Sequence, residues 1–271
     1  MISISNIAWD PSIDDRISKI LIKTGVAYVD IAPSKYFPTP SKATSAEILT
    51  IKNYWIEKNI KPLGMQSLLF GTQGLNVFGT PKIQDALLLH LSDIIFIGSE
   101  LGARKLVFGS PKNRDRSNLS DSKVTKIAVD FFSRLGRLAE KRGVVICLEP
   151  NPECYGSNFM TNSIETAEIV EATNCDSIRM QLDTGAMKIN KEGPRETIKK
   201  YAHLIHHIHI SEPYLVPVIS KNHYHQEISE SIVEFLPNLP MTIEMLSSSP
   251  AMAEEEILNS IKTIKELYRV A

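Results

Sequence analysis

The fold is decided by four apolar stretches in the second half of the chain: Val144-Val145-Ile146-Cys147-Leu148-Glu149, Ser177-Ile178-Arg179-Met180-Gln181-Leu182-Asp183, Leu204-Ile205-His206-His207-Ile208-His209 and Met241-Thr242-Ile243-Glu244. Each stretch is typical of a short buried strand that ends in a carboxylate or an imidazole. A charged side chain at the end of a buried strand is costly unless it is paired or coordinates a metal. Four such strand ends in succession predict one metal centre made of Glu149, Asp183, His209 and Glu244.

Strand-like and helix-like segments alternate along the whole chain. The expected strands are 2–8, 26–31, 62–68, 104–109, 144–149, 178–183, 205–210 and 241–245. The expected helices are 12–23, 44–58, 81–101, 121–142, 162–172, 194–202, 226–235 and 252–268. The clearest helix is the one after Ser120, because apolar residues recur there every three or four positions with charged residues opposite.

Eight strand–helix units in a chain of 271 residues predict an α/β fold, a single (β/α)8 TIM barrel that spans 1–271 as one domain. An open doubly wound sheet is the rival, but the chain has no Gly-x-Gly-x-x-Gly fingerprint. The longest irregular segments are 32–43, 69–80, 110–119, 150–161 and 211–225. All five follow an expected strand, so they are expected at the active-site face of the barrel.

Composition limits the partners and the compartment. The chain carries 30 basic and 31 acidic side chains, which gives a net charge of -1 and argues against a nucleic-acid partner. Its three cysteines have no framework spacing, as is typical of a reducing compartment. No apolar run approaches the roughly 20 residues of a membrane span, and the N-terminus does not resemble a secretory signal. We therefore expect a cytoplasmic protein without a membrane partner.

The four expected ligands define the kind of metal. Three carboxylates and one imidazole form a hard, oxygen-rich set that suits one Mn²⁺, Mg²⁺ or Co²⁺ ion and also accepts Zn²⁺. This set is unsuited to a thiolate zinc site. Mn²⁺ is the cation that we expect first.

The four motifs together resemble the sugar isomerase/epimerase superfamily with the xylose-isomerase-like barrel, and within it the ketose 3-epimerases. The resemblance covers almost the whole chain and is strongest in Leu148-Glu149-Pro150, Gln181-Leu182-Asp183-Thr184-Gly185, His207-Ile208-His209-Ile210-Ser211-Glu212 and Thr242-Ile243-Glu244-Met245. It implies that Glu149, Asp183, His209 and Glu244 bind one divalent metal. It also implies a sugar substrate and a homodimer.

The resemblance further implies that Glu149 and Glu244 form the acid/base pair. A metal-chelated ketose loses the proton next to its carbonyl to one carboxylate, which forms an enediolate. A second carboxylate returns a proton from the other face and inverts that carbon. Return of the proton to the neighbouring carbon would give an aldose–ketose isomerisation instead. The sequence leaves open which glutamate acts first.

The chain departs from the ketose 3-epimerase pattern at two positions. Ala186 stands where that group has a histidine in Asp-x-x-His, and Leu215 stands where it has an arginine in Ser-Glu-x-x-Arg. Two polar substrate contacts are therefore missing, and we expect poor activity on free hexuloses. The expected substrate is less polar at that end or carries an anionic group that Arg114 or His225 reaches.

Further candidates for substrate contacts lie near the expected strand ends. His207 lies two residues before His209 on the same strand face, where it lines the barrel or supports a ligand. Glu212 follows strand seven, Glu153 lies in the strand-five loop, and Trp9 closes strand one. Trp9 either packs under the loops or forms an apolar wall of the pocket.

Three classes of alternative function compete with the leading prediction of a sugar epimerase or isomerase. The same metal site could serve a keto-cyclitol dehydratase or a hydroxypyruvate isomerase. An apurinic endonuclease needs extra zinc-binding histidines, and Ala186 breaks the Asp-x-x-His motif. A non-catalytic sugar-binding barrel is the third alternative, although the intact set of four ligands argues against it.

Overall fold

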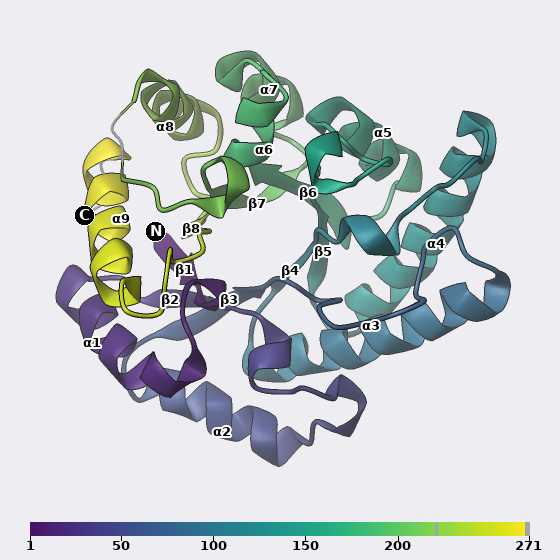
Figure 1. The fold of residues 1–271 in the computed structure, drawn as a ribbon. Coiled ribbons are helices and arrows are strands. Elements are labelled where there is room, and N and C mark those ends of the chain that lie inside the picture. Colours follow the sequence, from purple (N-terminus) through teal and green to yellow (C-terminus); the bar gives the residue numbers. More distant parts are fainter. Residues whose placement is uncertain (220–221, 269–271) are drawn as a thin grey trace.

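The computed structural model describes residues 1–219 and 222–268. Within them, eight parallel strands close in sequence order into one barrel, with β1 paired to both β2 and β8 (Figure 1). The strands are β1 (Ile2–Ser5), β2 (Tyr28–Ile31), β3 (Lys61–Met65), β4 (Lys105–Phe108), β5 (Val145–Leu148), β6 (Ile178–Asp183), β7 (Ile205–Ile210) and β8 (Met241–Ile243). The prediction of an α/β fold with a single TIM barrel is confirmed.

Helices form a ring around the strands (Figure 1). They are α1 (Asp14–Thr24), α2 (Ser45–Ile56), α3 (Pro81–Leu101), α4 (Asp121–Lys141), α5 (Ser163–Thr173), α6 (Thr184–Ile189), α7 (Pro194–Tyr201), α8 (His223–Phe235) and α9 (Ala253–Leu267). No helix of the described residues is long and apolar enough to cross a membrane.

The helix starts follow the local sequence. Thr44 and Glu47 form a capping box at the start of α2, in which the Thr44 hydroxyl accepts from the Glu47 N–H and the Glu47 carboxylate accepts from the Thr44 N–H. Helix α4 buries one face, which includes Phe131 and Phe132, and keeps its charged residues outside. These signals explain why the expected helices lie within a few residues of the observed ones.

Several strands are shorter than expected, such as β3, which ends at Met65 within the expected strand 62–68, and three further differences concern local turns and helices. Strand one ends at Ser5, whose hydroxyl accepts from the Ile7 N–H and starts a 3-10 turn, Asn6–Ala8. Helix α6 lies between the expected strand 178–183 and the expected helix 194–202, where no element was expected. Helix α8 begins at His223, within the expected loop 211–225, and the Asn222 side chain caps it. Residues 220 and 221 of that loop, and the last three residues of the expected domain 1–271, lie outside the described residues.

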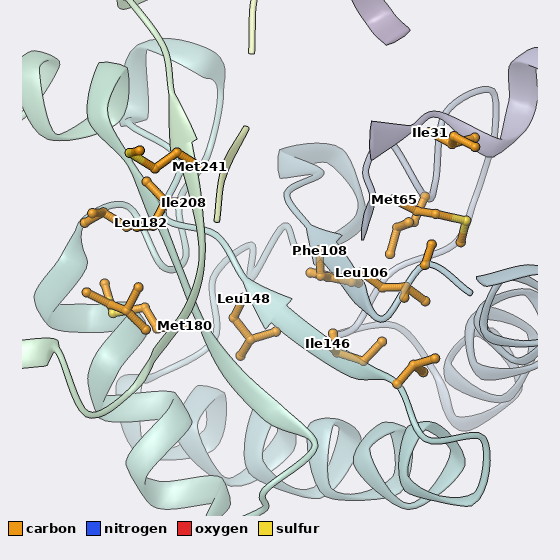
Figure 2. Packing of buried hydrophobic residues seen from close by; sticks show 14 of the residues in the cluster. Ile31, Met65, Leu106, Phe108, Ile146, Leu148, Met180, Leu182, Ile208 and Met241 are labelled. Carbon is orange, nitrogen blue, oxygen red and sulfur yellow. The ribbon is translucent and has the colours of Figure 1, made fainter. Parts of the chain in front are cut away.

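Alternate side chains of each strand face opposite sides. Ile146 and Leu148 of β5 face the helices and join the apolar layer between helices and barrel, together with Met180 and Leu182 of β6 (Figure 2). The side chains between them face the barrel interior. That interior is polar in its lower part, where the Ser3 hydroxyl donates to Asp30 at 2.8 Å. The hydrophobic core therefore lies mainly between the barrel and the helices, and polar side chains can occupy the barrel interior.

Candidate metal centre

Four side chains meet at the carboxyl ends of β5 to β8. Each of Glu149, Asp183, His209 and Glu244 offers one ligand atom, and these atoms all lie within 4.8 Å of one another. His209 Nδ1 lies 3.1 Å from Glu149 Oε1, 3.1 Å from Glu244 Oε2 and 3.9 Å from Asp183 Oδ2. All four residues are buried. The structure thus brings together the four residues that the sequence predicts as metal ligands.

Strand register explains this convergence. Asp183 on β6 and His209 on β7 are direct partners, and Ile210 is the partner of Ile243 on β8. Glu244 follows that pair, and its N–H donates to the Ile210 carbonyl at 3.0 Å. The Glu149 N–H donates to the Phe108 carbonyl of β4 in the same way, at 3.2 Å. Parallel strands with matched ends therefore place all four side chains on one level of the barrel.

The cluster is electrostatically unbalanced. Burial raises the pKa of Asp183 well above its ordinary value, and the neighbouring charges of Glu244 and Glu149 raise it further. Burial alone would lower the pKa of His209, but the Glu244 charge and hydrogen bonds with Glu149 and Glu244 raise it well above its ordinary value. Three buried carboxylates around one imidazole therefore favour a bound positive charge.

The two glutamates are held in the same way. Each points one oxygen at His209 Nδ1 and gives the other to a neutral amide. Gln66 Nε2 donates to Glu244 Oε1 at 2.8 Å, and Asn151 Nδ2 donates to Glu149 Oε2 at 3.2 Å. Both amides line the cavity above the cluster. Each amide fixes the orientation of a carboxylate and leaves its charge in place.

Sequence reasoning missed Gln66 and Asn151. Gln66 lies near the end of the expected strand 62–68 and directly follows the observed β3, and Asn151 is two residues after Glu149, so their position was the available signal. A neutral amide can be buried at much lower cost than a charged side chain, so its position after apolar residues does not indicate a functional site. Ser211 was missed for the same reason; its hydroxyl donates to Asp183 Oδ2 at 2.9 Å.

Two small residues leave room for the ligands. A Cβ at Gly109 would lie 1.9 Å from Glu149 Oε2, so any larger residue displaces that carboxylate. A Cβ at Gly185 would lie 2.8 Å from the Ser211 hydroxyl oxygen. Asp183 also caps α6, since its Oδ1 accepts from the Ala186 N–H at 2.6 Å. The unexpected helix α6 therefore helps to orient one of the four ligands.

His207 lies below the centre, in the polar barrel interior. It is fully buried, and its Nε2 lies 2.9 Å from Asp30 Oδ2. The Gln181 amide lies 2.9 Å from His207 Nδ1, and the orientation with nitrogen toward His207 also lets its oxygen accept from the His209 N–H at 3.0 Å. Burial lowers the pKa of His207, so the neutral ring donates to Asp30. Its place is beneath His209, where it supports a ligand and does not line the cavity.

Glu212 lies at the wall of the cavity, where the sequence predicts a substrate contact. Its Oε2 accepts from Lys188 Nζ at 2.6 Å, and its Oε1 lies 3.1 Å from His225 Nε2. Burial alone would raise the pKa of Glu212, but the hydrogen bonds with His225 and Lys188 lower it to about 2. Glu212 is thus held as a carboxylate that can accept from a hydroxyl group.

His225 and Arg114 lie behind the cavity, and not at its mouth as the sequence suggested. His225 is fully buried in the first turn of α8, between Glu212 and the Tyr268 hydroxyl at 3.0 Å. The turn Pro111–Asn113 sends the chain inward, so that Arg114 is fully buried and its Nη1 donates to the Glu149 carbonyl at 2.8 Å. Burial lowers the pKa of Arg114 to about 10, so its charge remains at neutral pH.

Trp9 and Glu153 also lie away from the cavity lining. The Trp9 ring is buried, and its Nε1 donates to Asp14 Oδ1 at 2.7 Å, which matches the reading that it packs under the loops. Glu153 is exposed in a 3-10 turn of the β5 loop. Of the suggested substrate contacts, Glu212 is therefore the one in direct reach of a ligand in the cavity.

A cavity of about 510 Å³ opens above the four ligands. Its floor consists of Glu149, Asp183 and Glu244, together with Gln66 and Asn151. Its size is within the range of about 300–1,000 Å³ that small-molecule sites occupy. The cluster therefore has direct access to a ligand of sugar size.

Comparison with known proteins identifies the family. The family model described as xylose isomerase-like TIM barrel matches residues 19–248, which is most of the chain. The chain belongs to this family. A comparison of the sequence with curated proteins found no match.

Solved structures share the fold across almost the whole chain. The D-psicose 3-epimerase of Clostridium cellulolyticum H10, solved with D-tagatose, has a TM-score of 0.81 at 15% identity and covers 98% of this chain and 99% of its own. The 3-keto-D-glucoside 4-epimerase of E. coli has a TM-score of 0.77 at 15% identity and covers 97% and 98%. The IOLI protein, solved with a zinc atom, has a TM-score of 0.74 at 18% identity and covers 98% and 97%.

The residues of this chain fit a divalent cation. The donor set is three carboxylates and an imidazole nitrogen, all buried and convergent. Glu149 and Glu244 lie close to the cavity, so a ligand bound there has two carboxylates beside it. The donor set suits Mn²⁺, Mg²⁺ or Co²⁺ and also accepts Zn²⁺.

Proposed function

We propose that the protein is a divalent-metal-dependent epimerase or isomerase of a ketose or keto-sugar derivative. The observation that supports this proposal most directly is the pair of amide-held glutamates beside one metal cluster at the floor of a sugar-sized cavity. The epimerase structures that share this fold support the same reaction class. Glu149, Asp183, His209 and Glu244 would hold the cation, for which we expect Mn²⁺ first.

When bound, the cation would act as a Lewis acid that makes the proton next to the substrate carbonyl removable. Glu149 and Glu244 come from β5 and β8, with β6 and β7 between them. One carboxylate would take the proton, and the other would return one, which inverts the carbon between them. Gln66 and Asn151 would keep the two carboxylates aimed, because a hydrogen bond to one oxygen leaves the other free.

Glu212 would orient the substrate. Lys188 and His225 already bind its oxygens, so it remains ionised and rigid over the ordinary pH range. A rigid acceptor holds a sugar hydroxyl at low entropic cost. Ala186 and Leu215 add apolar surface to the cavity where the ketose 3-epimerase pattern has polar side chains.

The competing functions use the same floor differently. A keto-cyclitol dehydratase would use the second glutamate to protonate the departing hydroxyl, and a hydroxypyruvate isomerase would use it to return the proton to the neighbouring carbon, whereas an epimerase needs the two carboxylates on opposite faces of one carbon. The charged residues of the described cavity lining are all acidic, which is unfavourable for a DNA phosphodiester. A non-catalytic sugar-binding barrel would not require two amide-held carboxylates.

Proton exchange in D₂O tests the proposal. The Mn²⁺-loaded protein is incubated with a panel of ketoses and keto-sugars, and NMR locates any carbon that acquires deuterium. We expect metal-dependent exchange next to the carbonyl, with inversion of that carbon for an epimerase or deuterium on the neighbouring carbon for an isomerase. A protein that binds Mn²⁺ and substrate but exchanges no proton would contradict the proposal.

A further inference from the structure

The cavity wall differs in chemistry from its floor. Away from the four ligands it is lined by side chains of β4 and of the loops after β3 and β7, among them Leu68, Leu69, Phe70, Val107, Tyr214 and Leu215. We call these six residues the apolar wall. Leu68, Leu69 and Val107 are buried behind the cavity surface, whereas Phe70 and Tyr214 are exposed at its mouth. A ligand that contacted the protein only through hydrogen bonds would leave the apolar wall in contact with water, which is unfavourable.

Positive charge is absent from the described residues that line the cavity. The charged ones are Glu149, Asp183, Glu212 and Glu244, all of them acidic. Of the cations near the lining, Lys188 pairs with Glu212, Arg114 donates to the Glu149 carbonyl from behind, and Lys112 is exposed beside the lining residue Pro111. The proposed cation offsets the charge of the floor carboxylates, but an anionic substituent away from that cation would find no cationic side chain in the described lining.

The loop after β7 holds its apolar side chains at the mouth in a strained conformation. Tyr214 has φ 61° and Leu215 has φ 56°, both in the left-handed region that large side chains avoid. The Tyr214 N–H donates to the Tyr155 hydroxyl at 2.7 Å, and the Leu215 carbonyl accepts from the Leu246 N–H at 2.7 Å. Strain of this kind persists where surrounding contacts impose it, and it concentrates at ligand sites.

We propose that the substrate is an uncharged keto-sugar that carries an apolar substituent, such as an O-alkyl or O-aryl group, and that the apolar wall binds this substituent. The proposal rests on the proposed function for the position of the sugar over the floor. The sugar hydroxyls face Glu212 and the two amides, and the substituent lies against Phe70, Tyr214 and Leu215. The cavity of about 510 Å³ lies within the range of about 300–1,000 Å³ that small-molecule sites occupy, and its apolar wall offers a surface for such a substituent.

Equilibrium binding to the Mn²⁺-loaded protein tests this inference without turnover. The probes share one core: D-fructose, its 1-O-benzyl and 6-O-benzyl ethers, and its 1- and 6-phosphates. Isothermal titration should show at least one benzyl ether binding at least about tenfold more tightly than fructose, and both phosphates binding more weakly than fructose. Benzyl ethers no tighter than fructose, or a phosphate that binds most tightly, would overturn the inference.

Variants locate the substituent. Phe70→Ala and Leu215→Ala should each weaken the benzyl ether by about three- to tenfold, while the advantage over fructose shrinks accordingly. Val233→Ala, an exposed apolar residue on α8, is the matched control and should keep that advantage. Unchanged benzyl affinity in both wall variants would place the substituent elsewhere and refute the assignment.

The same titrations separate this inference from the proposed function. Tight binding of a benzyl ether without deuterium exchange on any probe would refute the epimerase proposal and leave the substrate class standing. Metal-dependent exchange on fructose, with no preference for the ethers, would support the epimerase proposal and refute the inferred apolar substituent.

Discussion

The floor and the wall of one cavity follow opposite physical rules. On the floor, Glu149 and Glu244 are buried and each has a hydrogen-bond partner for the oxygen that does not face His209. On the wall, Phe70 is 75% exposed and Tyr214 is 68% exposed, and neither is packed into the core. A buried charge tolerates almost no change in its surroundings, whereas an exposed apolar side chain tolerates many. The floor should therefore fix the chemistry, and the wall should tune which molecule receives it.

The largest expected effect is the loss of either glutamate. Glu149→Gln and Glu244→Gln should each abolish turnover, because loss of general acid–base action alone costs about 10² to 10⁴-fold and the change also weakens the metal site. Circular dichroism should show that the fold survives. Glu153→Gln, a change at an exposed glutamate of the β5 loop, is the control and should keep full exchange activity. Activity retained in either floor variant would rule out a two-glutamate mechanism.

Metal affinity tests the floor independently of any substrate. The double variant Asp183→Asn with His209→Ala removes two of the four ligand atoms and should weaken Mn²⁺ by at least about 100-fold. Titration of chelator-stripped wild type should give one site per chain. Wild-type affinity in the double variant would show that the cation lies elsewhere.

The affinity for Mn²⁺ should also decrease when the pH is lowered. Burial and the Glu244 charge raise the pKa of Asp183, and the surrounding carboxylates raise the pKa of His209, so both sites hold protons at higher pH than usual when no cation is bound. A cation must displace these protons. Titrations in buffers of different ionisation enthalpy should show proton release, with weaker binding at lower pH.

A change of one methyl group beside the floor should be nearly as harmful as the loss of a ligand. Gly109→Ala would place a Cβ 1.9 Å from Glu149 Oε2, which forces that carboxylate to move. Displacement of a reacting group by about 1 Å costs on the order of 100-fold in rate. The melting temperature should change little, because the side chain that moves faces the cavity. Ser110→Ala, at the next residue of the lining, serves as the control.

Removal of an amide should have a smaller and pH-dependent effect. Burial alone would raise the pKa of Glu244, but the His209 charge and hydrogen bonds with His209, Asp183 and Gln66 lower it; Gln66→Leu deletes one of these hydrogen bonds, so this pKa should rise. The carboxylate is then protonated at higher pH, and the acidic limb of the kcat/KM profile should move upward, with a loss of about tenfold at its optimum. An unchanged profile would mean that Gln66 only fills space.

The smallest change concerns the wall. Leu215→Arg adds a cation to a lining whose described charges are all acidic, and it should improve binding of fructose 6-phosphate by about tenfold. Leu215→Met keeps the volume without the charge and is the control. Equal phosphate affinity in both variants would show that residue 215 does not face the ligand.

The amino-acid sequence alone determined the barrel and its chemistry-bearing level. Alternating apolar segments predicted the strands, and the charged residue that ends each of four consecutive strands predicted Glu149, Asp183, His209 and Glu244 as one cluster. This prediction was possible because parallel strands of one barrel end at a common level, so position along a strand translates directly into position in space.

Only the tertiary structure decided where loop residues point. Arg114 and His225 looked equally suited to a ligand, yet a turn after β4 and the start of α8 bury both behind the cavity. Gln66 and Asn151 are uncharged and therefore did not stand out in the sequence, yet their amides donate hydrogen bonds to the two glutamates. A strand repeats every two residues, and its side chains can be assigned to a face by counting. A loop has no period, so the direction of its side chains depends on contacts with distant segments, such as Tyr155 with Tyr214, which the sequence does not record.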